Sequence, residues 1–117
     1  HFKNINDLFG HLKGDEVLIA LSRTLEACSR QDDLVFRWGG EEFVILLPRT
    51  SLETALKIAE SVRAAVAHIT LPGLPRFTVS IGVARHDPEE SIDALFKRVD
   101  DALYRAKNDG RNKVLAA

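Results

Sequence analysis

The chain has 117 residues, of which 45% are hydrophobic, and its 16 basic and 17 acidic side chains give a formal net charge of −1. This length fits one domain over residues 1–117 and is sufficient to bury a core. The balanced charge argues against a nucleic-acid polymer as partner, and no apolar run is long enough to span a membrane. Cys28 is the single cysteine, which excludes an internal disulfide framework and a cysteine-rich zinc site.

The first third of the chain predicts two helices. Residues 3–10 suit a short helical turn that ends at Gly10. Residues 15–29 predict a longer helix, because apolar residues recur there at spacings of three and four. Its apolar face consists of Val17, Leu21, Leu25 and Cys28.

Residues 34–47 predict a β-hairpin, because two apolar runs are joined by Gly39-Gly40 and the pair Glu41 and Glu42. Glycine accepts positive φ and lets another molecule approach the backbone closely, so we expect a tight turn at Gly39-Gly40. Both carboxylates then lie at the mouth of the hairpin, where a divalent metal could meet a phosphate. An ordinary solvent-facing turn is the alternative interpretation.

The second half predicts two more helices and two strands. Thr50 and Glu53 match a capping box, and the helix behind them is stopped by Pro72-Gly73. Alternation over residues 77–83 indicates a strand. Ser91 is expected to cap the last helix, Gly110 to end it, and residues 114–115 to form a final short strand. The order α-α-β-β-α-β-α-β predicts an α+β fold, in which helices cover one face of a mainly antiparallel sheet.

Polar residues near the chain start suggest a guanine-binding role. An Asn amide and an Asp carboxylate, here Asn6 and Asp15, can together read the polar edge of guanine. Lys3 and His11 lie in the same glycine-punctuated segment. The alternative is structural, with Asp15 as the N-cap of the helix it precedes.

Two further polar pairs have the chemistry of phosphate recognition. Lys107 and Arg111 could hold phosphate oxygens, or simply complement the dipole of a helix C-terminus. Arg30 and Asp33 could bind a guanine base and a phosphate together, or form part of an ordinary charged loop.

Four segments of the chain occur together in a recognisable order and spacing. They are Phe2-Lys3-x-x-Asn6-Asp7-x-x-Gly10-His11-x-x-Gly14-Asp15, Arg37-Trp38-Gly39-Gly40-Glu41-Glu42-Phe43, Thr78-Val79-Ser80-Ile81-Gly82-Val83-Ala84 and Asp101-Ala102-Leu103-Tyr104-x-Ala106-Lys107-x-x-Gly110-Arg111-Asn112. In these segments the chain closely resembles the GGDEF family, the diguanylate cyclases, in a GGEEF variant. The resemblance covers essentially the whole chain.

The resemblance implies a domain similar to the palm of nucleotide cyclases and polymerases, with a ferredoxin-like core. It implies that two such domains, each holding one GTP, meet as a homodimer and make cyclic di-GMP with release of pyrophosphate. It also implies a cytoplasmic domain that works with a sensory or regulatory domain elsewhere. The helix and strand that open such domains, including a metal-binding Asp, would precede residue 1.

Roles for individual residues follow from the same resemblance. Glu41 is expected to bind Mg²⁺ (or Mn²⁺) and to accept the 3′-hydroxyl proton, with Glu42 as a neighbouring carboxylate. Lys3 is the candidate stabiliser of the transition state. The substrate-binding set comprises Asn6, His11, Asp15, Gly39, Gly40, Lys107 and Arg111. Arg30 and Asp33 match an inhibitory site for the product. The alternative function is a catalytically silent GGDEF domain that binds GTP or cyclic di-GMP as a regulatory module.

Overall fold

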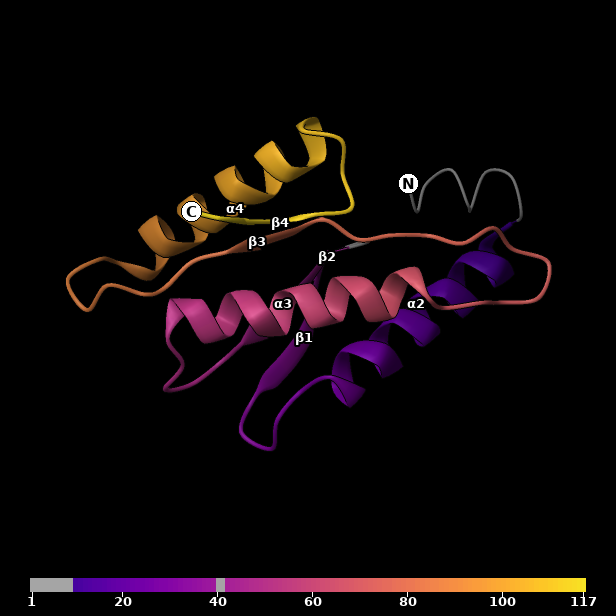
Figure 1. The fold of residues 1–117 in the computed structure, drawn as a ribbon, viewed down its shortest axis with the longest axis horizontal. Coiled ribbons are helices and arrows are strands. Elements are labelled where there is room, and N and C mark those ends of the chain that lie inside the picture. The colour runs from indigo at the N-terminus through magenta and orange to yellow at the C-terminus, as the bar shows by residue number, and fades with distance from the viewer. Residues whose placement is uncertain (1–9, 40–41) are drawn as a thin grey trace. The chain divides into compact units, whose positions relative to one another are not determined.

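The computed structural model describes residues 10–39 and 42–117, with only the backbone described for His11 and Gly39. The described elements follow the chain in the order shown in Figure 1: α2 (His11–Ala27), β1 (Leu34–Gly39), β2 (Glu42–Leu46), α3 (Leu52–Ala67), β3 (Ile81–Val83), α4 (Ile92–Asn108) and β4 (Val114–Ala116). The α+β class is confirmed, with three helices and small sheets in this part of the chain. A helical turn is predicted for residues 3–10, and residues 3–9 of that range lie outside the described residues.

The chain divides into two compact units. The first contains the described part of His1–Pro48 together with Ala65–Phe77, and the second contains Arg49–Ala64 together with Thr78–Ala117. Each unit has a two-stranded sheet: β1 and β2 pair antiparallel in the first, and β3 and β4 pair parallel in the second. The parallel pair differs from the mainly antiparallel expectation because the two strands are joined through a helix, and such a crossover returns the chain in the same direction.

Helix α2 begins four residues earlier than predicted. Gly10 occupies its N-cap position with φ 86°, and no side chain caps the helix. Asp15 therefore lies inside α2, and the alternative interpretation of Asp15 as an N-cap is wrong. The predicted apolar face is confirmed by the burial of Val17, Leu21 and Leu25. Cys28 is half-buried at the C-cap.

Helix α3 is capped by a different residue from the one predicted. The Ser51 hydroxyl accepts a hydrogen bond from the Thr54 N–H at 3.1 Å, so Ser51 replaces Thr50 as the cap. Glu53, the expected partner in a capping box, lies instead 3.6 Å from the Lys57 ammonium. The helix ends at Ala67, ahead of the predicted stop. Its buried face is Ala55, Ala59, Val62 and Val66.

Helix α4 has the two ends that the sequence predicts. The Ser91 hydroxyl accepts from the Ala94 N–H at 3.1 Å. Gly110 has φ 98°, and the Arg111 N–H donates to the Ala106 carbonyl at 3.0 Å. This is the hydrogen bond of a Schellman ending, in which a glycine takes the left-handed position after the C-cap.

Strand β3 is shorter than the alternation over residues 77–83 predicts. It pairs with β4 over Ile81–Val83, in register with Val114–Ala116, while residues 77–80 have no ladder partner in the described chain. Alternation identifies residues suited to a strand, but a ladder also needs a neighbour. Helix α4 contacts both strands of this pair (Figure 1).

None of the helices within residues 10–39 and 42–117 combines the length and the apolar character that a membrane span requires.

Candidate functional site

The hairpin that carries the candidate carboxylates is formed, but the turn predicted at Gly39-Gly40 does not include Gly39. Four residue pairs, from Leu34↔Leu46 to Arg37↔Phe43, follow one register, and Gly39 then pairs with Glu42. The register shift leaves Trp38 as an extra residue on β1, which is a β-bulge. Gly39 is thus still part of the strand, and the residues that join the strands are 40 and 41. Gly40 and Glu41 lie outside the described residues.

Glu42 begins β2 beside this bulge, and its side chain is exposed. A bulge increases the local twist of a strand pair and re-aims the side chains next to it, which is why bulges are frequent beside active sites. Trp38, on the bulge, is 61% exposed although it is a large aromatic residue. The tip of the hairpin therefore presents a carboxylate and an aromatic ring to solvent.

Asp15 lies on an exposed face of α2 and has no hydrogen-bond or ion-pair partner in the described chain. Leu18 follows three residues later on the same face of the helix. A groove of about 360 Å³ begins there and runs between α2 and the hairpin, lined in part by Leu18, Ser22, Val35 and Phe43. This arrangement places a carboxylate one helical turn from a partly apolar groove.

Lys107 and Arg111 occupy the C-terminal end of α4 in the second unit. Lys107 is in the last turn of the helix, and Arg111 follows the helix with φ 63°. The side chain of Arg111 is exposed, and neither cationic group has a protein partner among residues 10–39 and 42–117. Both cations thus keep their hydrogen-bonding capacity for a ligand, beyond any interaction with the helix dipole.

Arg30 and Asp33 bind each other. The Arg30 Nε and Nη2 groups donate to Asp33 Oδ1 at 3.2 and 3.0 Å, and the Arg30 N–H donates to Oδ2 at 2.8 Å. The Asp33 N–H returns a bond to the Arg30 carbonyl at 3.1 Å, which closes a four-residue turn. The guanidinium lowers the pKa of Asp33, whose side chain is only 1% exposed. The Arg30 side chain is 46% exposed.

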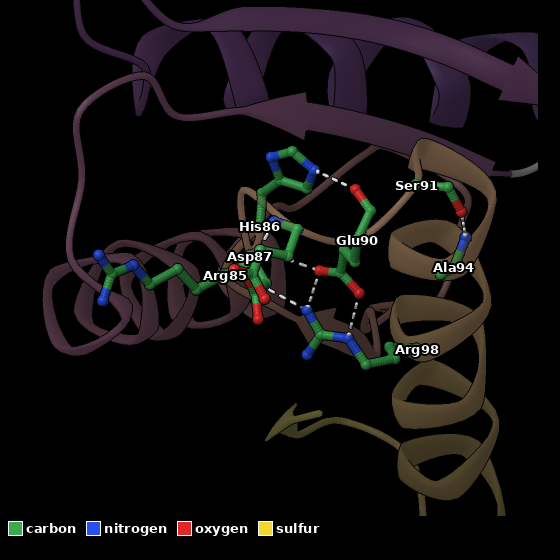
Figure 2. A network of polar contacts seen from close by, with 8 residues as sticks. Arg85, His86, Asp87, Glu90, Ser91, Ala94 and Arg98 are labelled. Carbon is green, nitrogen blue, oxygen red and sulfur yellow. Dashed lines mark hydrogen bonds and ion pairs between the residues drawn. The ribbon is translucent and has the colours of Figure 1, made fainter.

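A polar network holds the loop between β3 and α4, and Figure 2 shows its residues converging on Glu90. Arg98 donates to the Glu90 carboxylate from Nε at 3.0 Å and from Nη2 at 2.5 Å, and Nη2 also donates to the Arg85 carbonyl at 2.6 Å. The Asp87 N–H donates to Glu90 Oε1 at 3.0 Å. Sequence patterns did not indicate this network, because Glu90 precedes the helix that carries Arg98 and the two residues are eight apart.

The candidate residues are distributed over both units. Asp15, Arg30, Asp33, Gly39 and Glu42 belong to the first unit, and Lys107 and Arg111 to the second. Lys3, Asn6, Gly40 and Glu41 lie outside the described residues, as does the side chain of His11. Within residues 10–39 and 42–117, no cluster of three or more His, Cys, Asp or Glu side chains is arranged to hold a metal ion. The expected metal ligand, Glu41, is not among these residues.

The sequence profile described as "Diguanylate cyclase, GGDEF domain" matches residues 1–113. The chain therefore belongs to the GGDEF domain family. The match includes the bulged hairpin with its Gly-Gly-Glu-Glu-Phe sequence and the basic end of α4, the two features that carry candidate ligands in the described chain.

Named relatives and solved structures agree with this assignment. The chain is 75% identical over 116 residues to diguanylate cyclase DgcM of Escherichia coli K12, covering 99% of the chain and 28% of the relative. It is 47% identical over 120 residues to diguanylate cyclase DgcP of Pseudomonas aeruginosa, covering 100% of the chain and 18% of that protein. The chain thus spans less than a third of these relatives. The active GGEEF domain of a Vibrio cholerae diguanylate cyclase superposes with a TM-score of 0.91 at 38% identity, over 99% of this chain and 76% of that one.

Proposed function

We propose that this chain is a diguanylate cyclase domain over residues 1–117, which condenses two GTP molecules into cyclic di-GMP and releases two pyrophosphates. The observation that carries the proposal is the hairpin β1–β2 with its bulge at Trp38, because it presents Glu42, which follows Glu41 in the sequence, at the start of β2. We propose the finer fold as well, a palm of the nucleotide-cyclase and polymerase type. The reaction consumes GTP, which places the domain in the cytoplasm.

The reaction is a phosphoryl transfer in which each 3′-hydroxyl attacks the α-phosphorus of the other GTP. A new P–O bond forms, the bond to the bridging oxygen breaks, and pyrophosphate leaves. Glu41 accepts the proton of the attacking hydroxyl. Because this chemistry depends on positioning and charge neutralisation, the chain needs few reacting groups and many that bind phosphate.

Carboxylate oxygens are suitable ligands for Mg²⁺ or Mn²⁺, and Glu41 with Glu42 supply them at the hairpin tip. The exposed Glu42 carboxylate at the start of β2 fits this donor set. When bound, the metal ion neutralises charge on the triphosphate. Lys107 and Arg111 hold phosphate oxygens, and Lys3 stabilises charge that develops in the transition state.

The groove beside Asp15 supports a guanine site on α2. A planar base can lie against Leu18 and Phe43 in this partly apolar groove, while the Asp15 carboxylate accepts hydrogen bonds from the guanine N–H groups. Asn6 reads the remaining edge, and His11 lies at the substrate. Adenine presents different donors and would leave the carboxylate poorly paired, so the site favours GTP over ATP.

Arg30 and Asp33 are proposed as the inhibitory site for cyclic di-GMP. Asp33 orients Arg30 through a two-point contact, and we expect the half-exposed guanidinium to stack on guanine or reach a phosphate of the product. The crystal structure of DgcB from Caulobacter crescentus, with a TM-score of 0.94 and 32% identity over the whole of this chain and 64% of that one, contains c-di-GMP. A second GGDEF domain and a regulatory domain are the proposed protein partners.

The proposal is tested by comparing Glu41→Gln with wild type in the intact protein, with GTP and Mg²⁺. The substitution removes a ligand charge with little change in shape, so cyclic di-GMP synthesis should fall by at least about a hundredfold. Glu53→Gln is the matched control, because that carboxylate is 82% exposed on α3 and should leave the rate unchanged. Near wild-type synthesis by Glu41→Gln would show that Glu41 is neither metal ligand nor base.

A further inference from the structure

The segment that follows α4 has an unusual backbone. Gly110, Arg111 and Asn112 have φ values of 98°, 63° and 48°, so three successive residues lie in the left-handed region. Glycine adopts this region easily and Asn adopts it more often than most residues, but the side chain of Arg111 makes it unfavourable. Such conformations persist when surrounding contacts hold them, and they occur often at functional sites.

The Schellman ending of α4 explains only part of this conformation. It accounts for Gly110 and fixes the Arg111 N–H on the Ala106 carbonyl at 3.0 Å. It makes no contact with Asn112, one residue further along. The helix end therefore does not fix the position of Asn112.

The side chain of Arg63 on α3 contacts Asn112 from outside the helix end. Its Nη1 donates to the Asn112 Oδ1 at 2.8 Å, across 49 residues of sequence. The opposite edge of the same guanidinium is fixed on its own helix, because Nε lies 2.9 Å from both carboxylate oxygens of Glu60. This contact raises the pKa of Arg63 and lowers that of Glu60, so both stay charged. The Arg63 side chain is only 21% exposed.

We propose that Arg63 is a positioning residue for GTP, acting through Asn112 to hold the left-handed backbone of Arg111. The inference rests on the proposed function, in which Arg111 binds phosphate. An arginine on a fixed backbone loses less conformational entropy when it binds an anion. The Arg63–Asn112 contact, here called the clamp, therefore improves substrate affinity. Because Arg111 contacts phosphates before and during the reaction, the clamp affects KM more than kcat.

The test is a double-mutant cycle in the intact protein with Arg63→Met, Asn112→Ala and the double variant. Each single variant should raise KM for GTP about tenfold and change kcat by less than about twofold, since each removes one charge-assisted hydrogen bond. The double variant should be no worse than either single variant, because both remove the same contact. Arg63→Met should still fold, because the Glu60 carboxylate it leaves behind is 56% exposed.

Lys57→Met is the control, since Lys57 is a basic residue on the same helix that pairs with Glu53 one turn away. The KM of this variant for GTP should equal that of wild type. Amide hydrogen exchange gives a readout that does not need turnover: the amide of residue 111, which donates to the Ala106 carbonyl in wild type, should exchange faster in Arg63→Met. If wild type makes cyclic di-GMP and the variants keep its KM for GTP, the clamp is overturned. It is also overturned if amide exchange in Arg63→Met equals that in wild type, whether or not the protein is active. Failure of wild type to convert GTP overturns the proposed function instead.

Discussion

Glu90 is the most strongly perturbed carboxylate in the described chain. Arg98 donates to it from two nitrogens and the Asp87 N–H from a third, and these bonds lower its pKa from the ordinary 4.5 to about 2. A depressed carboxylate pKa means that the charged form is favoured in the folded state. The stability it contributes is therefore complete above about pH 4.5 and is lost as the pH falls toward about 2.

This predicts the pH dependence of a variant. Glu90→Gln should melt at a lower temperature than wild type at pH 7, and the difference should shrink as the pH falls from about 4.5 to about 3. Thermal melting of the intact protein across this range measures the effect. Glu89→Gln is the control, since that side chain is exposed and should show no such convergence. A difference that stays constant down to pH 3 would mean that the Glu90 charge has no role in stability.

Replacement of Arg30, again a single residue, tests the proposed inhibitory site. Arg30→Ala should weaken inhibition by added cyclic di-GMP, because it removes the guanidinium that stacks on guanine and reaches phosphate. The concentration of product that halves the initial rate should rise at least about tenfold, as for the loss of one charged hydrogen bond. Asp33 keeps its bond from the backbone N–H of residue 30, at 2.8 Å in wild type, so the turn should survive. Arg76→Ala is the exposed control, and unchanged inhibition in Arg30→Ala would reduce this turn to an ordinary charged loop.

At the scale of elements, helix α4 packs tightly against β3 at Gly82. A Cβ at Gly82 would lie 2.6 Å from the Val99 carbonyl oxygen and 2.7 Å from the Leu103 backbone nitrogen. Both are backbone atoms of a helix, so neither can yield cheaply. The glycine in Ser-Ile-Gly-Val-Ala, which the sequence presents as a small residue in a strand pattern, is thus a packing requirement.

Gly82→Ala should destabilise the protein by about 1–3 kcal/mol, the range for overpacking of a tight contact. Chemical denaturation of the intact protein measures this loss. Gly10→Ala is the control: Gly10 has φ 86°, but a Cβ at this position would meet no other atom within 4 Å, so the variant reports backbone strain without overlap. A loss in Gly82→Ala no larger than in Gly10→Ala would show that the two elements can separate at little cost.

At the scale of whole elements, sequence patterns predicted the buried faces better than the ends. The spacing of Val17, Leu21 and Leu25 gave the core face of α2 correctly, because a helical repeat depends on many residues at once. The start of α2 was misplaced because Gly10 begins it without a side-chain cap, and Asp15 offered a misleading cap signal. Ser51 and Thr50 are both good caps, and only the contact with Thr54 distinguishes them.

For the molecule as a whole, the family resemblance predicted the candidate ligands, and the structure adds what supports some of them. Lys107 and Arg111 were expected at a helix end, and both are found there with no protein partner in the described chain. The Arg63–Asn112 contact could not be predicted, since it joins residues 49 apart whose types are common on surfaces. Long-range polar contacts of this kind leave no periodic signal in a sequence.

The proposed reaction requires two copies of the domain, since each contributes one GTP to a single product. The named relatives are much longer than this chain, which spans 28% of one and 18% of the other. We propose that the remaining parts of such proteins bring two GGDEF domains together in response to a signal. The catalytic assay therefore belongs in the intact protein, where pairing is possible.

The conversion of two GTP into one cyclic di-GMP can be measured directly through the stoichiometry of the reaction. Purified intact protein is incubated with GTP and Mg²⁺, cyclic di-GMP is quantified by chromatography with mass detection, and pyrophosphate is quantified in the same sample. We expect one cyclic di-GMP and two pyrophosphates for every two GTP consumed, with no corresponding product from ATP. Saturable binding of GTP without release of pyrophosphate would contradict it and would identify a catalytically silent GGDEF domain.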